Sequence, residues 1–242
     1  MLNEYDNDDF FEKYSRMERS EKGLEGAGEW HILKAMLPDF KGKSVLDIGC
    51  GFGWHCKYAA ENGAESVVGI DASDNMLGRA RLINADPKIE YVKCFVEEYE
   101  YPVERFDVVI SSLVLHYVED LNSVFKKIYS TLKAGGNFIF NIEHPVLTAN
   151  EKQEWEHDEN GSITHWAVDN YFDEKKINTA FLGCDVVKYH KTLASIINGL
   201  LDSGFVIKRI SEPYPSEKML NENEYMKYEL KRPMMLIVSA EK

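Results

Sequence analysis

The stretch S-V-L-D-I-G-C-G-F-G-W-H-C-K-Y-A-A-E-N-G-A-E-S-V-V-G-I-D, residues 44–71, decides the fold. Its first apolar run, residues 45–48, is typical of a buried strand. Residues 54–62 have the character of a helix that stops at the following glycine. A second apolar run, residues 67–70, ends on Asp71. The stretch therefore predicts a strand, a glycine loop, a helix and a second strand with an acid at its tip.

The glycine loop has a chemical use. Glycine at positions 49, 51 and 53 lets the backbone turn sharply and approach a ligand closely, because no Cβ intervenes. The loop leads a ligand to the positive end of the helix. An acid about twenty residues later, here Asp71, accepts hydrogen bonds from ribose hydroxyls. Together these features indicate a cofactor that contains adenosine.

The spacing of the glycines narrows the choice of cofactor. A dinucleotide fingerprint needs G-x-G-x-x-G, whereas this chain has G-x-G-x-G followed by Trp54. The bulky indole obstructs the close turn that a pyrophosphate needs. The P-loop pattern G-x-x-x-x-G-K-[ST] is absent from the sequence. A nicotinamide-dependent oxidoreductase is therefore the less favoured alternative.

The words V-L-D-I-G-C-G-F-G and G-I-D-A-S-D-N-M-L resemble motif I and the acidic loop of the class I S-adenosylmethionine-dependent methyltransferases. The segments S-S-L-V-L-H-Y at 111–117 and L-K-A-G-G at 132–136 also resemble this family. Further short matches, such as E-H-P at 143–145, resemble bacterial small-molecule methyltransferases of the ubiquinone and menaquinone biosynthesis type. The resemblance implies S-adenosylmethionine as the cofactor. It also implies an α/β fold with a Rossmann-like seven-stranded sheet, mostly parallel, whose last strand is antiparallel and whose two faces carry helices.

The resemblance also assigns cofactor contacts. In the family, the residue at Met76 often flanks the adenine, and an acid at the tip of the third strand is replaced here by Phe95. We therefore expect backbone groups near Val96 and the side chain of Glu97 to hold the adenine. Arg16 or Arg19 is a candidate for a charge-assisted contact with the cofactor's carboxylate, and Arg19 is included in the site. The predicted cofactor-binding residues are Asp47, Gly49, Cys50, Gly51, Gly53, Asp71, Ala72, Met76, Val96, Glu97, Ser111 and Arg19.

The rest of the chain completes one domain, residues 1–242. Residues 1–37 supply N-terminal helices that either cover the cofactor as a lid or form a loosely docked end. Residues 145–190 mix aromatic and polar side chains around a predicted turn at 159–162, which predicts short antiparallel strands inserted after the fifth strand. Such an insertion caps the crevice and carries substrate specificity. Residues 211–230 are expected to be an exposed loop between the last two strands.

Composition limits the partners. The net charge is −13, which argues against a nucleic-acid substrate, because a phosphate backbone needs Lys and Arg neutralisation. The four cysteines have no C-x-x-C spacing, so neither a disulfide framework nor a metal site is predicted. No apolar run reaches the length of a membrane span. We expect a cytoplasmic monomer or homodimer that acts on a small molecule.

The chemistry implied by the resemblance is an in-line displacement at a methyl group. Positioning two reactants well is worth roughly 7–11 kcal/mol of the barrier. An oxygen or nitrogen acceptor that loses a proton needs a general base, and His116, His144 and His190 are the candidates. Each of them has an alternative role as a hydrogen-bonded structural histidine. Glu143 is adjacent to His144, but neighbouring strand residues point to opposite faces, which weakens a simple dyad.

The sequence therefore predicts methyl transfer from S-adenosylmethionine to an oxygen or nitrogen of a small molecule, with an aromatic or apolar acceptor suggested by the aromatic insertion. The first alternative is a protein that binds S-adenosylmethionine without transferring its methyl group. A nicotinamide-dependent oxidoreductase and a methyltransferase acting on proteins are the others. The acceptor and the identity of the base stay open at this level.

Overall fold

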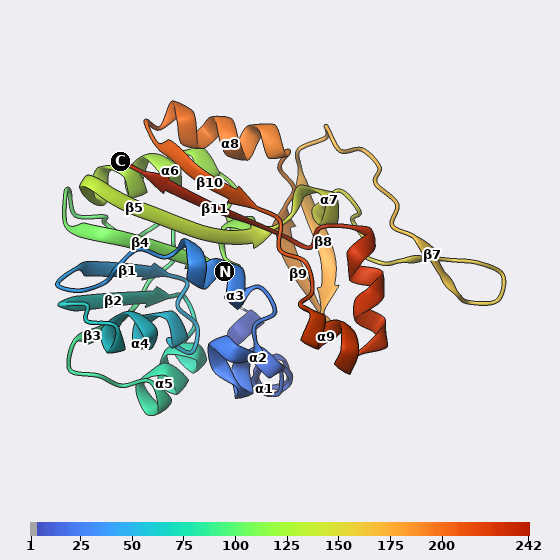
Figure 1. The fold of residues 1–242 in the computed structure, drawn as a ribbon, viewed down its shortest axis with the longest axis horizontal. Helices are drawn as coiled ribbons and strands as arrows, with labels where there is room; N and C mark the ends of the chain where they lie inside the picture. Colours follow the sequence, from blue (N-terminus) through green and yellow to red (C-terminus); the bar gives the residue numbers. More distant parts are fainter. Residues whose placement is uncertain (1–3) are drawn as a thin grey trace.

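A computed structural model describes residues 4–242 and shows a seven-stranded sheet with the order β10-β11-β5-β4-β1-β2-β3 (Figure 1). The strands are β1 Ser44–Ile48, β2 Ser66–Asp71, β3 Ile89–Lys93, β4 Phe106–Ser112, β5 Leu132–Glu143, β10 Val206–Ser211 and β11 Met235–Glu241. The last strand, β11, runs antiparallel to both β5 and β10, whereas the pairs among β1 to β5 are parallel. The predicted fold class is confirmed.

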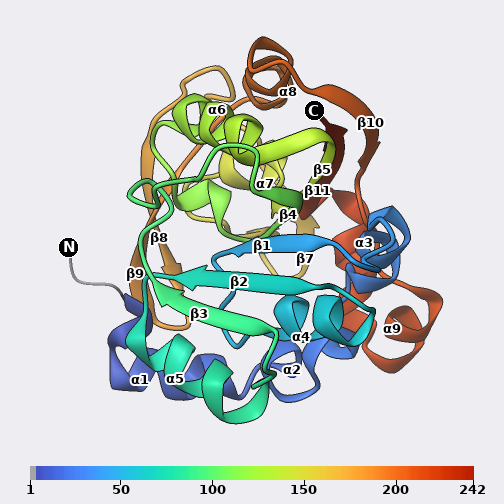
Figure 2. The ribbon, with the colours of Figure 1, turned by 90° about the vertical axis from the view of Figure 1, so that its left-hand side faces the viewer.

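Helices cover both faces of the sheet, as predicted. α6 (Leu121–Thr131) and α8 (Leu193–Asp202) cover one face, and α3 (Trp30–Met36) and α4 (Trp54–Glu61) pack against the other (Figure 2). Side chains of a strand alternate between the faces. In β1, Leu46 packs in the hydrophobic core on the side of α6 and α8, and Val45 packs in the core on the side of α3 and α4. All five residues of β1 are buried, which explains its continuous apolar pattern.

The insertion after β5 has the predicted antiparallel character. It consists of α7 (Pro145–Thr148), the hairpin β6 (Glu156–His157) with β7 (Ile163–His165), and the hairpin β8 (Lys176–Phe181) with β9 (Cys184–Tyr189). The predicted turn at 159–162 contains Gly161 at φ +80°, in the left-handed region. β8 and β9 stand beside the end of the central sheet, and the β6–β7 hairpin projects away from it (Figure 1). Its role in specificity stays a prediction.

The segment 211–230 connects the last two strands and is largely exposed, as expected, but the prediction that it is a loop is wrong. It forms α9 (Glu217–Glu222) and the 3-10 segment η4 (Glu224–Lys231). The Ser216 hydroxyl accepts a hydrogen bond from the backbone N–H of Met219, and the Asn223 side chain accepts one from Tyr225. Two capping residues therefore start helical turns in a segment that carries little apolar periodicity.

The N-terminal residues 4–36 form η1 (Glu4–Asp6), α1 (Asp8–Ser15), α2 (Glu18–Glu21), η2 (Gly23–Gly26) and α3. The carboxylate of Asp6 accepts hydrogen bonds from Ser73 Oγ at 2.6 Å and from the backbone N–H of Asn75 at 3.2 Å. This ties η1 to the start of α5 (Asp74–Ile83). The segment is therefore docked from residue 4 onward, while residues 1–3 lie outside the described chain. Among residues 4–242, no helix combines the length and apolar character needed to cross a membrane.

Candidate active site

The glycine loop joins β1 to α4, and its three glycines have positive φ angles of 68°, 52° and 78° at Gly49, Gly51 and Gly53. A Cβ on Gly49 would lie 2.1 Å from the side chain of Val114, and one on Gly53 would lie 2.2 Å from the hydroxyl of Tyr91. A Cβ on Gly51 would meet no atom of the described residues 4–242 within 4 Å. Gly49 and Gly53 are thus needed for packing, whereas Gly51 borders open space that a ligand can fill.

Asp71 ends β2 beside this loop. One carboxylate oxygen accepts the backbone N–H of Gly51 at 2.9 Å, and the other accepts the N–H of Ser73 at 2.9 Å. Removal from water raises the pKa of Asp71 to about 6, although the backbone donors oppose this rise. Each carboxylate oxygen has a second lone pair, so the group can still accept hydrogen bonds from ribose hydroxyls.

Asp47 and Ser111, both predicted to bind the cofactor, lie beneath the loop. Burial raises the pKa of Asp47 to about 7, and its carboxyl accepts a hydrogen bond from Cys56 Sγ at 3.2 Å. The Ser111 hydroxyl donates to the carbonyl of Ile48 at 3.2 Å and is fully buried. These contacts connect β1 with α4 and β4. The side chains of Asp47 and Ser111 therefore hold together the elements that carry the glycine loop.

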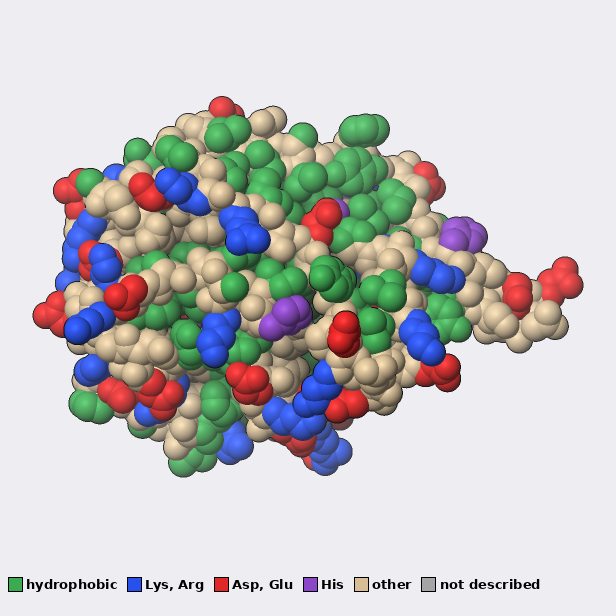
Figure 3. Space-filling view, viewed as in Figure 1, with side chains coloured by type: hydrophobic (Ala, Val, Ile, Leu, Met, Phe, Trp, Pro, Cys, Tyr) green, Lys and Arg blue, Asp and Glu red, His purple; other side chains and the backbone are tan. Residues whose placement is uncertain are grey.

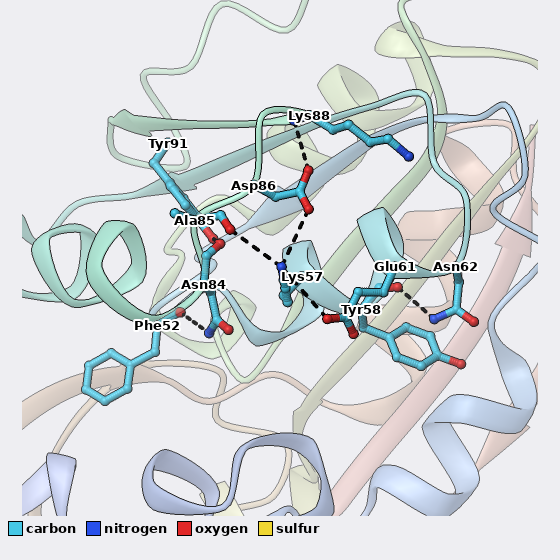
Figure 4. A network of polar contacts seen from close by, with 10 residues as sticks. All are labelled: Phe52, Lys57, Tyr58, Glu61, Asn62, Asn84, Ala85, Asp86, Lys88 and Tyr91. Carbon is cyan, nitrogen blue, oxygen red and sulfur yellow. Dashed lines mark hydrogen bonds and ion pairs between the residues drawn. The ribbon is translucent and has the colours of Figure 1, made fainter.

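A polar network holds the back of the loop (Figure 4). The Asn84 side-chain amide donates to the carbonyl of Phe52 at 2.8 Å, and the hydroxyl of Tyr91 donates to the Asn84 carbonyl at 3.0 Å. Lys57 on α4 reaches Asp86 at 3.5 Å. The turn between α5 and β3 therefore fixes the conformation of the glycine loop. Sequence reasoning missed Asn84 and Tyr91, because no local motif marks them.

A cavity of about 80 Å³ lies where the glycine loop meets the N-terminal segment and the end of β4. It is lined by Tyr14, Arg19, Ser20, Gly23, Leu24, Ala27, Glu29, Gly49, Cys50, Gly51, Phe52, Trp54, His55 and Ser112. Four predicted residues, Arg19, Gly49, Cys50 and Gly51, meet here. Three buried polar atoms of the lining, Ser20 Oγ, Trp54 Nε1 and His55 Nε2, have no hydrogen-bond partner within residues 4–242. These free polar groups fit the polar amino-acid end of S-adenosylmethionine.

The residues predicted to contact the adenine do not gather around one cavity. Ala72 directly follows Asp71, and Met76 is buried in the packing of α5. The carbonyl of Val96 accepts the Tyr101 hydroxyl at 3.0 Å, and the Glu97 side chain is exposed. None of these four residues lines the cavity at the glycine loop. Their contacts with adenine stay predictions.

Two of the three candidate histidines have both ring nitrogens engaged. His144 Nδ1 accepts the backbone N–H of Val146 at 3.0 Å, and its Nε2 donates to Glu212 at 2.9 Å. Burial lowers the pKa of His144.

His190 is held in the same manner. Its Nε2 donates to the carbonyl of Tyr171 at 2.9 Å, and its Nδ1 accepts the hydroxyl of Thr148 at 2.7 Å. In both residues the two ring nitrogens are engaged in hydrogen bonds, and their predicted role as a base stays a prediction.

His116 differs from them. It lies in η3 (Leu115–Tyr117), just after β4, and its buried Nδ1 has no hydrogen-bond partner in the described chain. Burial lowers its pKa to about 4, Glu143 acts in the opposite direction, and Lys188 lowers the pKa further. Leu113, two residues before η3, has φ +58°, a strained conformation for a non-glycine residue at the end of a strand. His116 is thus a buried histidine whose Nδ1 has no hydrogen-bond partner within residues 4–242.

An ion pair connects the insertion to the sheet beside His116. Lys188 of β9 donates to Glu143 of β5 at 2.6 Å and to the side chain of Gln153 at 3.0 Å, and Gln153 also donates to Glu143 at 3.0 Å. The Lys188 side chain is 3% exposed and that of Glu143 is 17% exposed. This network was not predicted, because the three residues are far apart in sequence.

Comparison with known proteins places this geometry in a family. The family model described as "Methyltransferase domain" matches residues 46–140. A solved Listeria monocytogenes protein, assigned to the S-adenosylmethionine-dependent methyltransferases, is 48% identical with a TM-score of 0.83 over 89% of this chain and 98% of that chain. An S-adenosylmethionine-dependent methyltransferase from Mesorhizobium loti is 40% identical with a TM-score of 0.85 over 91% of this chain and all of that one (100%).

A more distant relative carries a named substrate. Phosphoethanolamine N-methyltransferase 3 from Arabidopsis thaliana is 35% identical over 119 residues, which are 48% of this chain and 24% of that protein. The chain therefore matches only a minor part of that enzyme.

Proposed function

The chain belongs to the class I S-adenosylmethionine-dependent methyltransferases, and we propose that it methylates an oxygen or nitrogen atom of a small molecule. Bound S-adenosylmethionine supplies an electrophilic methyl group on its sulfonium. In the proposal, Asp71 binds the ribose hydroxyls, the backbone at Gly51 borders the cofactor, and Arg19 binds the cofactor's carboxylate. The open space at Gly51 and the free polar atoms of the cavity support this placement.

The observation that supports a proton-bearing acceptor is the Nδ1 of His116, which has no hydrogen-bond partner among residues 4–242. A neutral imidazole at this position can accept a hydrogen bond from the acceptor and orient its lone pair. Its pKa of about 4 favours an oxygen acceptor over an amine. Methylation of a hydroxyl gives a very acidic oxonium, which even a weak base can deprotonate, whereas an ammonium ion needs a stronger base before it can react.

The small size of the acceptor is supported by the surroundings of His116. η3 lies between the end of β5 and β9, and the Glu143–Lys188 pair closes one side. The ring of Phe10 in α1 lies 5.8 Å from that of Phe181 in β8, so the N-terminal segment meets the insertion. The contact between the N-terminal segment and the insertion, together with the 3% exposure of His116, supports a metabolite rather than a folded protein as the acceptor.

The test is methyl transfer from S-adenosylmethionine carrying a labelled methyl group, with a cell extract as the source of acceptors. We expect label in the dialysable fraction. His116→Ala should lower the rate by about 10²–10⁴-fold with little change in cofactor affinity, which is the usual range for loss of a general base. The matched control is His157→Ala, at an exposed position of β6.

Label in protein would contradict the small-molecule proposal. Binding of the cofactor without any transfer would instead support the alternative of a binding protein. An unchanged rate in His116→Ala would remove His116 from the proposed chemistry.

A further inference from the structure

The central sheet has two edge strands, β3 and β10, and they differ in the side chains that they expose. Within residues 4–242, β3 pairs only with β2 and β10 pairs only with β11. No large hydrophobic residue of β3 is exposed, whereas β10 exposes Val206 (57%) and Ile210 (45%). An edge strand also presents unpaired backbone N–H and C=O groups, so an exposed apolar edge invites contact with another chain. The edge formed by β10 is therefore a candidate interaction surface.

The helix that precedes β10 extends this apolar surface. The polar residues of α8 are Ser195, Asn198 and Asp202, and the others are apolar or glycine. Leu201, near the end of the helix, is 50% exposed. A helix that is apolar around most of its circumference is normally covered on more than one side. Figure 3 shows hydrophobic side chains gathered over α8 and β10.

Two exposed side chains of opposite charge accompany these apolar residues. Asp202 ends α8 and Arg209 lies in β10, and neither side chain forms a hydrogen bond or an ion pair with another of the described residues 4–242. The neighbouring Lys208, in contrast, pairs with Glu241 at 3.3 Å. In a two-fold symmetric contact the same patch meets itself, so Asp202 of one copy can face Arg209 of the other. The charges of this surface are thus complementary to a second copy of the chain.

We propose that the chain forms a two-fold symmetric homodimer through the β10 face, which we define as Leu201, Asp202, Val206, Arg209 and Ile210. In this dimer the apolar side chains of the two copies pack against each other, and Asp202 pairs with Arg209 across the interface. None of the five residues lines the cavity at the glycine loop. The interface is therefore separate from the proposed site of methyl transfer.

Side-chain packing, and not a continuous sheet, holds the proposed dimer together. The pairing of β10 with β11 has a register shift between Ile207 and Arg209, which interrupts the regular ladder. Such irregularities and a lysine on the edge oppose direct pairing of strands from two chains. They leave the exposed side chains of the β10 face free to pack.

The experiment measures the mass of the protein by analytical ultracentrifugation over a range of concentrations. We expect an equilibrium between monomer and dimer. Val206→Asp should weaken dimerisation at least about tenfold, equivalent to about 1.4 kcal/mol, because it places a charge in the apolar contact. The matched control is Val103→Asp, at a residue that is 73% exposed in the segment between β3 and β4. The control should dimerise like the unaltered protein.

A charge exchange tests the proposed ion pair. Arg209→Glu and Asp202→Arg should each weaken dimerisation, because like charges then face each other across the interface. The double variant Asp202→Arg with Arg209→Glu should regain most of the affinity, since the opposite charges are restored. Amide hydrogen exchange gives an independent readout. We expect exchange in β10 to slow as the protein concentration rises, and exchange in β3, the other edge strand, to stay constant.

Three results would overturn the inference. A monomer at every concentration would exclude the homodimer, and the β10 face would then need a different partner. A dimer that is unaffected by Val206→Asp and by Arg209→Glu would lie on another surface. A double variant as weak as its single variants would exclude the pair of Asp202 and Arg209. Thermal unfolding of each variant shows that it is folded, and we expect little change in Tm because the substituted residues are exposed.

Discussion

At the scale of single residues, burial sets the charge of the group that is proposed to hold the ribose. Asp71 accepts two backbone N–H groups, yet removal from water is the larger influence and raises its pKa to about 6. Hydrogen bonds from ribose hydroxyls favour the carboxylate over the carboxylic acid. The charge state of Asp71 therefore couples cofactor binding to pH.

We predict that the affinity for S-adenosylhomocysteine falls as the pH drops below about 6, by up to about tenfold per pH unit, because protonation removes the acceptor. The affinity should level off above that pH. Calorimetric titrations between pH 4.5 and 8 measure this. Asp71→Asn should bind weakly with little pH dependence, and Asp74→Asn, at an exposed neighbouring carboxylate, should retain the profile. A pH-independent affinity of the unaltered protein would contradict the assignment.

Much of the loop was predictable at this scale, whereas the roles of the histidines were not. Gly49, Gly51 and Asp71 lie within one short motif, and the structure brings them together as expected. The three histidines are indistinguishable in sequence. Their partners, such as Glu212 for His144 and Tyr171 for His190, come from distant segments and appear only when the chain has folded.

At the scale of elements, the glycines of the glycine loop differ in the surroundings that a side chain would meet. Gly53 is enclosed by Tyr91, which the Asn84 network holds in place, and Gly51 faces open space. Both have positive φ, which costs roughly 1–2 kcal/mol for a residue with a Cβ. Of these two glycines, only Gly53 adds a steric clash to that cost.

We predict that Gly53→Ala loses more free energy of unfolding than Gly51→Ala, because its Cβ would lie 2.2 Å from the Tyr91 hydroxyl. Gly51→Ala should lose roughly 1–2 kcal/mol from backbone strain and should bind the cofactor more weakly. Urea denaturation and calorimetry give the two quantities. Equal destabilisation by both substitutions, with equal binding, would show that the loop does not have these two functions.

Helices and strands with a clear apolar periodicity were predicted from the sequence. Features that depend on capping residues or on a β-bulge were not. β5 begins at Leu132 and contains a register shift in its pairing with β4, with Gly135 at φ +73°. The helical turns of residues 217–231 depend on the capping residues Ser216 and Asn223. Serine and asparagine are also common in loops, so their presence in a short polar stretch does not predict a helix.

At the scale of the whole molecule, the proposed site lies between three separate parts of the chain. The N-terminal segment contacts the glycine loop through Phe11 and Phe52, whose ring centres are 5.8 Å apart, and meets the insertion through Phe10. The insertion is fixed to the sheet by Lys188 and Glu143. On the face shown in Figure 3, basic and acidic side chains are interspersed rather than gathered into one basic patch.

We predict that Lys188→Met destabilises the fold by about 3–5 kcal/mol, because it leaves the carboxylate of Glu143 buried without its ion-pair partner. The double variant Lys188→Met with Glu143→Gln should regain part of this loss. Lys176→Met, at an exposed position of β8, is the control. Thermal and urea unfolding measure the effect, and a loss as small as that of the control would mean that the pair does not anchor the insertion.

The most direct test of the account is calorimetric titration of the protein with S-adenosylmethionine, S-adenosylhomocysteine and NADH, repeated on Asp71→Ala and Asp74→Ala. We predict micromolar binding of the first two ligands, no binding of NADH, loss of binding in Asp71→Ala and normal binding in Asp74→Ala. Binding of NADH alone, or binding of the first two ligands that is unaffected by Asp71→Ala, would contradict the site built around the glycine loop.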